Sequence, residues 1–365
     1  MWLQTWDRWH EDVEREDVHF ARAPEYHGVP GDDGEGLKPY QAAVRTAEET
    51  APLLDEVRPD AMVVDILTVG GALAAEVAGC RWATLVPHVL PTPEPGFAPY
   101  SSGARLPRTR FGRDLWIALD PVVRRGAERG RDELNGARER LGLPALKHLH
   151  GGVSRELALV ATFPQLEYPR SSWHPSMRVT GPLMWERPFG EVETPAGDAP
   201  LVLIAPSTSQ DPEQRMLAAA LEGLANAPVR VLATTNRRAP AEPIAVPANA
   251  RLVDWLSYER SMPGCAAVVC HAGHGTVVRA LASGVPVVAC PATGDMFENA
   301  QRVAWAGAGV SLPRRLTTPR GIALAVQKVL SDSSYARRAG ELREWANRHD
   351  GRELAADALE ELARS

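Results

Sequence analysis

Short apolar runs rich in valine, leucine and alanine alternate along this chain with longer stretches in which apolar residues recur at helical spacing. Such alternation is typical of α/β proteins, because parallel strands are buried on both faces and are joined by helices. Strands are expected at 2–5, 18–21, 61–66, 82–86 and 157–162, and again at 201–205, 229–233, 251–253, 266–270 and 286–289. The pattern therefore predicts an α/β fold with parallel sheets.

Two irregular stretches divide this pattern. Residues 90–112 are too rich in proline for regular structure. A long ordered loop is often functional, although a plain connector is the alternative. Residues 182–200 are rich in proline and glycine and separate two halves of similar architecture. We expect a first domain over 1–185, a linker over 186–199 and a second domain over 200–365.

The most informative local pattern is VVCHAGHGTVVRAL at 268–281, which reads as a strand entering a helix through a small, polar turn. Gly273 and Gly275 would let a ligand approach the backbone closely. The new helix would direct its first amides and the positive end of its dipole at that ligand, which suits a diphosphate without a metal. Thr276 would add a hydroxyl and His271 a ring N–H. The alternative is that the glycines serve only to turn the chain.

A second strand–loop–helix unit follows directly. The run VPVVAC is followed by residues 291–300, PATGDMFENA, with a helix expected from about Asn299. In a doubly wound sheet, both loops emerge at the carboxyl ends of the strands, where ligands bind. The first loop suits phosphates, and the carboxylate of Asp295 in the second can accept hydrogen bonds from sugar hydroxyls.

The segment 271–312, HAGHGTVVRALASGVPVVACPATGDMFENAQRVAWAGAGVSL, closely resembles the donor-binding signature of family-1 glycosyltransferases, particularly bacterial enzymes that glycosylate natural products. The resemblance extends over nearly the whole chain, from TWDRWHEDVE near its start. It implies the GT-B fold, in which two Rossmann-like, doubly wound domains face each other across a cleft and the last helix crosses back to the first domain. It also implies a nucleoside-diphosphate sugar as co-substrate, with no metal or other cofactor.

The resemblance carries over residue by residue to several loops of the second half. The matching donor-site positions are Thr208, Trp255, Leu256, His271, Gly273, Gly275, Thr276, Arg279, Asp295 and Met296. His271 and the amides of Gly275 and Thr276 would contact the diphosphate, and Asp295 would hold the hexose. Trp255 would open the base-binding loop. In the first half, His88 follows a strand and would line the acceptor pocket, although a structural histidine is an equal alternative.

Three departures from the family pattern concern the donor. Arg279 stands where many members carry a glutamate that holds the ribose, Met296 replaces a glutamine, and Ser257-Tyr258 replaces a Pro-Gln pair. Because arginine cannot accept hydrogen bonds from ribose hydroxyls, a uridine-specific ribose clamp is disfavoured. The departures favour a thymidine-type deoxysugar donor, and a uridine-type donor is the alternative.

The family's catalytic histidine has no match here. In the family, a first strand and a glycine-rich loop bear this general base, whereas this chain starts at a segment that resembles the second strand. We therefore expect one βα unit of about 30 residues to be missing, which leaves the first domain incomplete. Strands 2–5 and 61–65 would face each other across an empty slot. Asp65 matches the aspartate that orients the base, although it could simply cap the following helix.

Composition fits an ordinary two-domain enzyme. The chain has 365 residues, 44% of them hydrophobic, and a net charge of −6, which argues against a nucleic-acid partner. Its four cysteines have no metal or disulfide spacing, as in reduced cytoplasmic proteins. Nothing in the sequence resembles a signal peptide or an apolar span of about twenty residues. The mixed charges of 114–143 indicate a solvated helix. We expect a cytoplasmic enzyme whose partners are a small-molecule acceptor and a nucleotide-sugar.

Three functions remain open. The first is an inverting glycosyltransferase that moves a hexose or deoxyhexose to a hydroxyl of a small hydrophobic acceptor. The second is a nucleotide-sugar-binding protein that is inactive because the segment with the general base is absent. The third, a nucleotide-sugar epimerase, follows from the same architecture, because a fold alone does not set the reaction.

Overall fold

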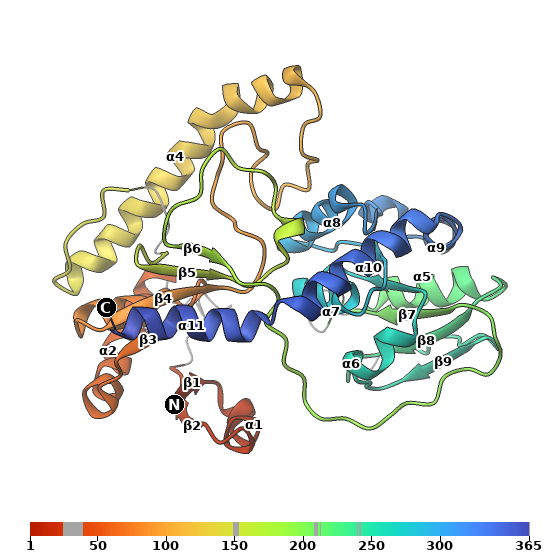
Figure 1. The fold of residues 1–365 in the computed structure, drawn as a ribbon, viewed down its shortest axis with the longest axis horizontal. Coiled ribbons are helices and arrows are strands. Elements are labelled where there is room, and N and C mark those ends of the chain that lie inside the picture. The colour runs from red at the N-terminus through yellow and green to blue at the C-terminus, as the bar shows by residue number, and fades with distance from the viewer. Residues whose placement is uncertain are drawn as a thin grey trace.

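The computed structural model describes residues 1–24, 39–148, 153–207, 211, 213–238, 240 and 242–364. Two larger parallel sheets lie side by side, each covered by helices, and a small two-stranded sheet lies beside the first of them (Figure 1). The predicted α/β class is therefore confirmed. All four cysteines are free.

The six-stranded sheet carries the candidate donor site. Its strands are β7 (Leu201–Ala205), β8 (Arg230–Thr234), β9 (Ala250–Val253), β10 (Ala267–Cys270), β11 (Val287–Ala289) and β12 (Gly309–Ser311). Their order, β12-β11-β10-β7-β8-β9, is that of a doubly wound sheet. The order reverses between β7 and β10, so the loops after these two strands diverge and leave the crevice in which such sheets bind ligands.

Alternating side chains of this sheet build two cores. Leu203 and Val268 face α7 (His274–Ala282), α8 (Asp295–Ala306) and α10 (Ser333–Arg348). Val202 and Val269 face α5 (Arg215–Leu224) and α9 (Pro319–Ser331) on the other side. Because both faces are buried, the central strands β7, β10 and β11 are apolar throughout, which is why they were visible in the sequence.

The four-stranded sheet has the order β3-β4-β5-β6. Its strands are β3 (Ala61–Asp65), β4 (Arg81–Val86), β5 (Leu157–Val160) and β6 (Met177–Val179). A layer formed by α2 (Pro39–Val57), α3 (Val69–Val77) and α4 (Arg110–Arg140) packs together beside it. The final helix, α11 (Gly351–Arg364), packs on β4 and β5 through Ala358 and Leu362 (Figure 1). The chain thus returns to its first sheet at its end.

The first two strands form a sheet of their own. In the described part of the chain, β1 (Trp2–Thr5) pairs with β2 (His19–Arg22), and β3 pairs with β4 alone. This small unit, which includes α1 (His10–Arg15), docks on the stretch after β6, where Arg187 pairs with the buried Asp12. Strands β1 and β3 are not paired with each other.

Several boundaries differ from those expected. Helix α8 begins at Asp295, not near Asn299, because Gly294 adopts a positive φ of 56° that starts the helix earlier. Strands β6 and β12 were not predicted, since each has only three residues and includes a polar one, whereas the equally short β11 is apolar throughout. The stretch between β6 and β7 contains neither helix nor strand over its described residues, 180–200.

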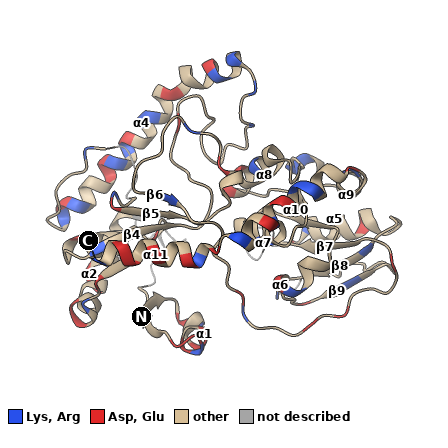
Figure 2. Ribbon diagram, in the orientation of Figure 1, with Lys and Arg blue, Asp and Glu red and all other residues tan. Residues whose placement is uncertain are grey.

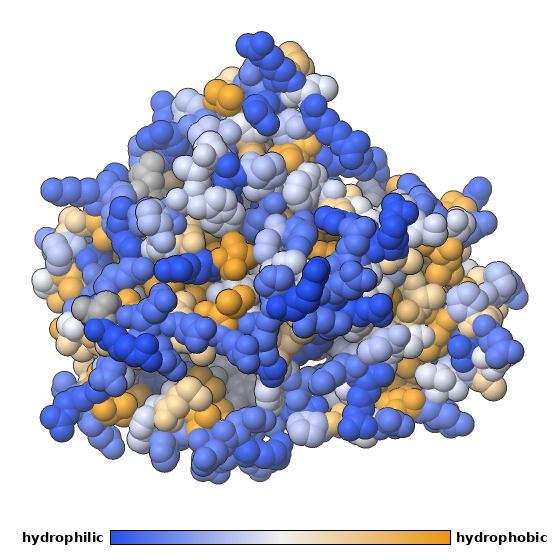
Figure 3. Space-filling model, in the orientation of Figure 1, coloured by the Kyte–Doolittle hydropathy of each residue, from blue (hydrophilic) through white to orange (hydrophobic). Residues whose placement is uncertain are grey.

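Surface charge follows the sequence pattern. Acidic and basic residues are interspersed along α4 (Figure 2), as the mixed charges of 114–143 predicted. The face shown in Figure 3 is mostly hydrophilic, with apolar side chains in scattered patches. Among the residues described, none of the helices is both long and apolar enough to cross a membrane.

Candidate functional site

His271 follows β10 at the point where the strand order reverses. Its ring is buried, and Nδ1 accepts a hydrogen bond of 2.9 Å from the amide of Ser207 in the loop after β7. Nε2 must then carry the proton, and it lies 3.2 Å from Oδ2 of Asp211. Both ring nitrogens are therefore engaged. The N–H that the sequence assigned to a diphosphate is directed at Asp211, and a phosphate oxygen would have to replace this carboxylate.

The carboxylate of Asp211 accepts hydrogen bonds from two backbone amides as well as from His271. Burial would raise its pKa, but hydrogen bonds from His271 and from the amides of Met216 and Arg215 lower it overall. The carboxylate is thus charged at neutral pH. Its neighbour Thr208, a predicted phosphate contact, lies outside the described residues.

The turn after His271 presents backbone to open space. A Cβ added at Gly273 would meet no atom within 4 Å, and one at Gly275 would meet only Nη1 of Arg279 at 3.5 Å. Helix α7 begins at His274, so the amides of His274 and Gly275 belong to the first turn, where an α-helix offers N–H groups no carbonyl of its own. The amide of Thr276 already donates to the carbonyl of Gly273 at 3.1 Å. The helix N-terminus can receive an anion, chiefly through the first two amides.

Asp295 lies next to this turn, in the first turn of α8. The buried amide of Asn299 donates to Oδ2 of Asp295 at 3.2 Å and to the carbonyl of Ala272 at 3.0 Å. One side chain therefore joins the two loops that were predicted to bind phosphate and sugar. Asp295 also stands in the first turn of α8, where the helix dipole interacts favourably with a negatively charged group.

The other residues predicted for the donor site lie in different surroundings. Trp255 is half-buried, and the guanidinium of Arg237 lies over its ring at 4.7 Å from the centroid. Leu256 and Met296 are buried in the core between the sheet and its helices. Arg279 donates to the carbonyls of Trp185 and Gly275. Arg279, which stands where many family members carry a ribose-holding glutamate, is thus bonded to the segment that precedes β7.

His274 connects the two larger sheets. Its Nε2 donates to the carbonyl of Ala161, just after β5, at 3.2 Å. Burial lowers the pKa of His274 to about 4, an effect that the hydrogen bond to Ala161 only partly offsets. The ring is therefore neutral at physiological pH, with the proton on Nε2.

On the first-sheet side, His88 and Asp65 lie at the carboxyl ends of neighbouring strands. Nδ1 of His88 lies 2.8 Å from the carbonyl of Val89 and 3.3 Å from the hydroxyl of Tyr100. Oδ1 of Asp65 accepts a hydrogen bond of 2.8 Å from the amide of Leu67. This local turn resembles the capping alternative, and the role of Asp65 in orienting a base stays a prediction.

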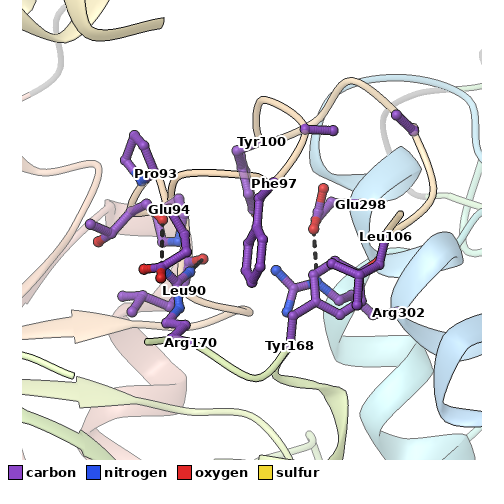
Figure 4. Close-up of a pocket in the computed structure, with 14 residues that line it drawn as sticks. Leu90, Pro93, Glu94, Phe97, Tyr100, Leu106, Tyr168, Arg170, Glu298 and Arg302 are labelled. Carbon is purple, nitrogen blue, oxygen red and sulfur yellow. Dashed lines mark hydrogen bonds and ion pairs between the residues drawn. The ribbon is translucent and has the colours of Figure 1, made fainter. Parts of the chain in front are cut away.

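A buried ionic cluster lies between the proline-rich loop and α8 (Figure 4). Arg302 donates to Glu298 at 2.7 Å and to Glu167 at 3.2 Å, and its guanidinium lies 3.6 Å from the ring centroid of Tyr168. Glu167 in turn accepts a hydrogen bond from the amide of Leu90 at 2.6 Å. The cavity beside the cluster measures about 20 Å³, room for about one water and no substrate. The cluster therefore joins the loop to α8.

Two residues of the site had not been singled out in the sequence. Asn299 lies one helical turn after Asp295, a relation that was hidden because the helix was expected to begin later. Asp211 meets His271 only through the fold and carried no local signal. In the described part of the chain, no group of three histidine, cysteine, aspartate or glutamate side chains could hold a metal ion.

Comparison with known proteins agrees with this architecture. Residues 218–362 match the family model "Erythromycin biosynthesis protein CIII-like, C-terminal domain". The chain is 32% identical to 4'-demethylrebeccamycin synthase of Lentzea aerocolonigenes over 325 residues, which cover 85% of this chain and 75% of the relative. It is 30% identical to a PGL/p-HBAD biosynthesis rhamnosyltransferase of Mycobacterium bovis, with 91% of this chain and 78% of that protein covered.

Solved structures share the whole fold. The glycotransferase of kitacinnamycin superposes with a TM-score of 0.75 at 22% identity, covering 97% of this chain and 89% of that one. The calicheamicin glycosyltransferase CalG4 superposes with a TM-score of 0.71 at 19% identity, covering 99% and 90%. These likenesses establish the GT-B architecture expected from the sequence. Together with the relatives above, they show that the chain belongs to the family-1 glycosyltransferases of the natural-product type.

Proposed function

We propose that this glycosyltransferase moves a hexose or deoxyhexose from a nucleoside-diphosphate sugar to a hydroxyl of a small hydrophobic acceptor, with inversion at the anomeric carbon. One observation carries the proposal: Asn299 joins Asp295 to the turn before α7 through two hydrogen bonds. A carboxylate suited to sugar hydroxyls thus lies one side chain away from a helix N-terminus suited to a diphosphate.

The chemistry follows from this arrangement. The diphosphate gains negative charge as the glycosidic bond to it breaks, and the N-terminus of α7 would stabilise that charge without a metal. The acceptor oxygen would attack from the opposite face, so the anomeric configuration inverts. Asp295 would hold the hexose in the orientation that exposes this face.

A thymidine-type donor is the preferred assignment. Arg279 donates to two backbone carbonyls and offers no acceptor to ribose hydroxyls. Among the structural neighbours, VinC was solved with dTDP and the spinosyn rhamnosyltransferase SpnG with thymidine diphosphate. SpnG was also solved with the spinosyn aglycone, a small-molecule acceptor. A rhamnosyltransferase among the relatives supports a deoxyhexose.

Calorimetry with dTDP, UDP and their glucose conjugates tests the donor assignment. We expect dTDP to bind at least as tightly as UDP, and Asp295→Asn to weaken dTDP-glucose about tenfold, ~1.4 kcal/mol, while dTDP binds as before. A strong preference for UDP would refute the thymidine-type assignment. Equal loss of dTDP and dTDP-glucose in the variant would remove Asp295 from the hexose site.

Product analysis separates the three candidate functions. A glycosyltransferase releases nucleoside diphosphate only as a new glycoside with inverted configuration, or free sugar, is formed. A donor-binding protein binds the nucleotide-sugar without releasing the diphosphate, and an epimerase changes the sugar configuration. Proton NMR of dTDP-glucose incubated with the chain and a phenolic acceptor distinguishes these outcomes.

A further inference from the structure

The first half of α4 is not buried by the rest of the protein. The buried residues of this helix, Leu134, Ala137 and Arg138, all lie near its end. Residues 110–133 are exposed or half-buried, and the start of the helix lies at the outer edge of the molecule, away from both larger sheets (Figure 1). A helix that is exposed in this way is expected to be polar on its free faces.

A stripe of large apolar side chains nevertheless runs along this half. Its members are between 41% and 79% exposed and follow one another at intervals of four, four and three residues, which places them on one face of the helix. We call this set the apolar stripe, and it consists of Phe111, Leu115, Leu119 and Val122. A contiguous apolar patch with a polar rim marks a surface that binds another molecule.

The apolar stripe faces away from the proline-rich loop. A Cβ added at Gly96 of that loop would lie 2.8 Å from Cγ of Arg113 and 3.6 Å from Cγ1 of Ile117, so these two residues face the loop. Each of them follows a residue of the apolar stripe by two positions, which is about 200° around the helix axis. The loop therefore packs on the opposite face of α4 and leaves the apolar stripe uncovered.

Arginines surround the apolar stripe and make this region positive. Residues 105–125 contain six arginines and two aspartates, although the whole chain carries a net charge of −6. All six arginines are exposed, and basic side chains are visible at this end of α4 in Figure 2. Arg110 directly precedes the apolar stripe, and Arg125 follows its last residue by three positions on the same side of the helix. One of the two aspartates, Asp114, lies 3.9 Å from Arg110.

A second copy of this chain does not complement the surface. In a symmetric dimer, the same patch lies on both sides of the interface. The arginines around one apolar stripe would then face those around the other, and like charges at short range repel. A different protein would have to supply a groove shaped to this convex helix, and nothing in the described part of the chain indicates such a partner.

An anionic lipid surface complements both features. Apolar side chains of an amphipathic helix enter the boundary between headgroups and acyl chains, and long arginine side chains reach the lipid phosphates. The negative surface also attracts each nearby arginine. We propose that the first half of α4 docks on the surface of an anionic lipid bilayer, with the helix lying in the plane of the surface and not crossing it.

Sedimentation with vesicles tests this docking on the full chain, without donor or acceptor, so the result does not depend on the proposed transfer. Vesicles of phosphatidylcholine alone are compared with vesicles that contain about 30% phosphatidylglycerol. We expect the chain to bind the anionic vesicles at least about tenfold more tightly. The affinity should fall as the concentration of NaCl is raised from about 0.05 to 0.5 M, because salt screens the arginines.

Two double variants separate the apolar contribution from the charged one. Phe111→Ser with Leu115→Ser should weaken binding to anionic vesicles at least about tenfold, because two large apolar side chains no longer leave water. Arg110→Gln with Arg125→Gln should weaken it about 30-fold, or about fivefold for each arginine. Both variants change exposed side chains, so the urea midpoint and the affinity for dTDP should stay as in the wild type.

Matched controls come from exposed positions on other helices. Leu324 and Leu354 are 55% and 43% exposed, and Arg314 and Arg315 form an exposed pair before α9. Leu324→Ser with Leu354→Ser, and Arg314→Gln with Arg315→Gln, should bind anionic vesicles as the wild type does.

Four outcomes would overturn the proposal. They are no binding to anionic vesicles, equal binding to both kinds of vesicle, unchanged binding by the two α4 variants, and equal losses in the controls. Sedimentation equilibrium provides a further check. A dimer that dissociates in Phe111→Ser with Leu115→Ser would assign the apolar stripe to a second copy of the chain instead of a lipid surface.

Discussion

At the scale of single residues, the candidate donor site depends on a few buried polar side chains. Asn299 is bonded to both Ala272 and Asp295, and its orientation is determined because both partners can only accept. Ala272 has a positive φ of 60°, unusual for a residue other than glycine. The hydrogen bond to its carbonyl helps to hold the backbone in this conformation.

Replacement of Asn299 with alanine should separate sugar binding from nucleotide binding. Without the amide, Asp295 loses its fixed position, so dTDP-glucose should bind about tenfold more weakly, ~1.4 kcal/mol, with dTDP less affected. Isothermal titration calorimetry measures both affinities. Asn249→Ala is the control, since Asn249 also uses its amide to bond two carbonyls, those of Leu224 and Val229, away from the site. The same loss in the control would show a general effect on stability.

His274 should make stability depend on pH. Its pKa is lowered from 6.5 to about 4 in the folded chain, mainly by burial. Between these values the unfolded chain binds more protons than the folded one, so the free energy of unfolding should fall as pH drops. The full effect is ~3 kcal/mol. Urea unfolding at several pH values should show a shallower dependence for His274→Gln, and identical slopes would contradict the buried neutral ring.

At the scale of elements, α8 connects the proposed sugar site with the proline-rich loop. Its first residue is Asp295, and one turn after Asn299 its buried Arg302 meets Glu167 from the stretch after β5. Burial raises the pKa of Glu167, an effect that Arg302 and the amide of Leu90 oppose. The helix and the loop are thereby held together by charges that are costly to leave unpaired.

Replacement of Arg302 with alanine should therefore be strongly destabilising. It would leave Glu167 and Glu298 buried without their partner, at a cost of about 3–5 kcal/mol. Arg364→Ala on α11 provides the control, because the ion pair of Arg364 with Glu360 is largely exposed and should contribute less than about 1 kcal/mol. Chemical denaturation of both variants checks the difference. A triple variant that combines Arg302→Met with Glu167→Gln and Glu298→Gln removes all three charges. If its stability returns toward that of the wild type, unpaired charge is the cause of the loss.

At the scale of the whole molecule, the chain ends on the sheet where its first half was formed. Helix α11 follows the helices of the six-stranded sheet in sequence but packs on β4 and β5. Leu362 lies in a buried cluster with Leu157 and Leu159. The hydrogen bond between His274 and Ala161 is a second connection between the two sheets.

A charge placed in this cluster should lower the stability of the first half of the chain without abolishing donor binding. Leu362→Asp would bury a carboxylate among apolar side chains, and we expect a cost of about 3 kcal/mol or more. Leu354→Asp is the control on the same helix, because Leu354 is 43% exposed and should change stability by less than about 0.5 kcal/mol. Urea unfolding measures the difference, and calorimetry with dTDP reports on the six-stranded sheet. Similar stability of the two variants would contradict the packing of α11.

The sequence by itself determined the strands and the two candidate ligand loops. A strand buried on both faces must be apolar throughout, so β7 and β10 were visible as runs, and their loops had to emerge at one edge of a parallel sheet. The brief β6 and β12 carried too little pattern, and the start of α8 depended on the backbone conformation of Gly294.

Only the tertiary structure decided which partners the polar side chains have. Asp211 was brought to His271 and Glu167 to Arg302 by the packing of segments that are distant in sequence. Arg279 turned to a backbone carbonyl 94 positions away rather than remaining a free ribose contact. Local patterns report burial and backbone conformation, whereas a hydrogen bond between distant residues exists only once the helices and sheets have packed.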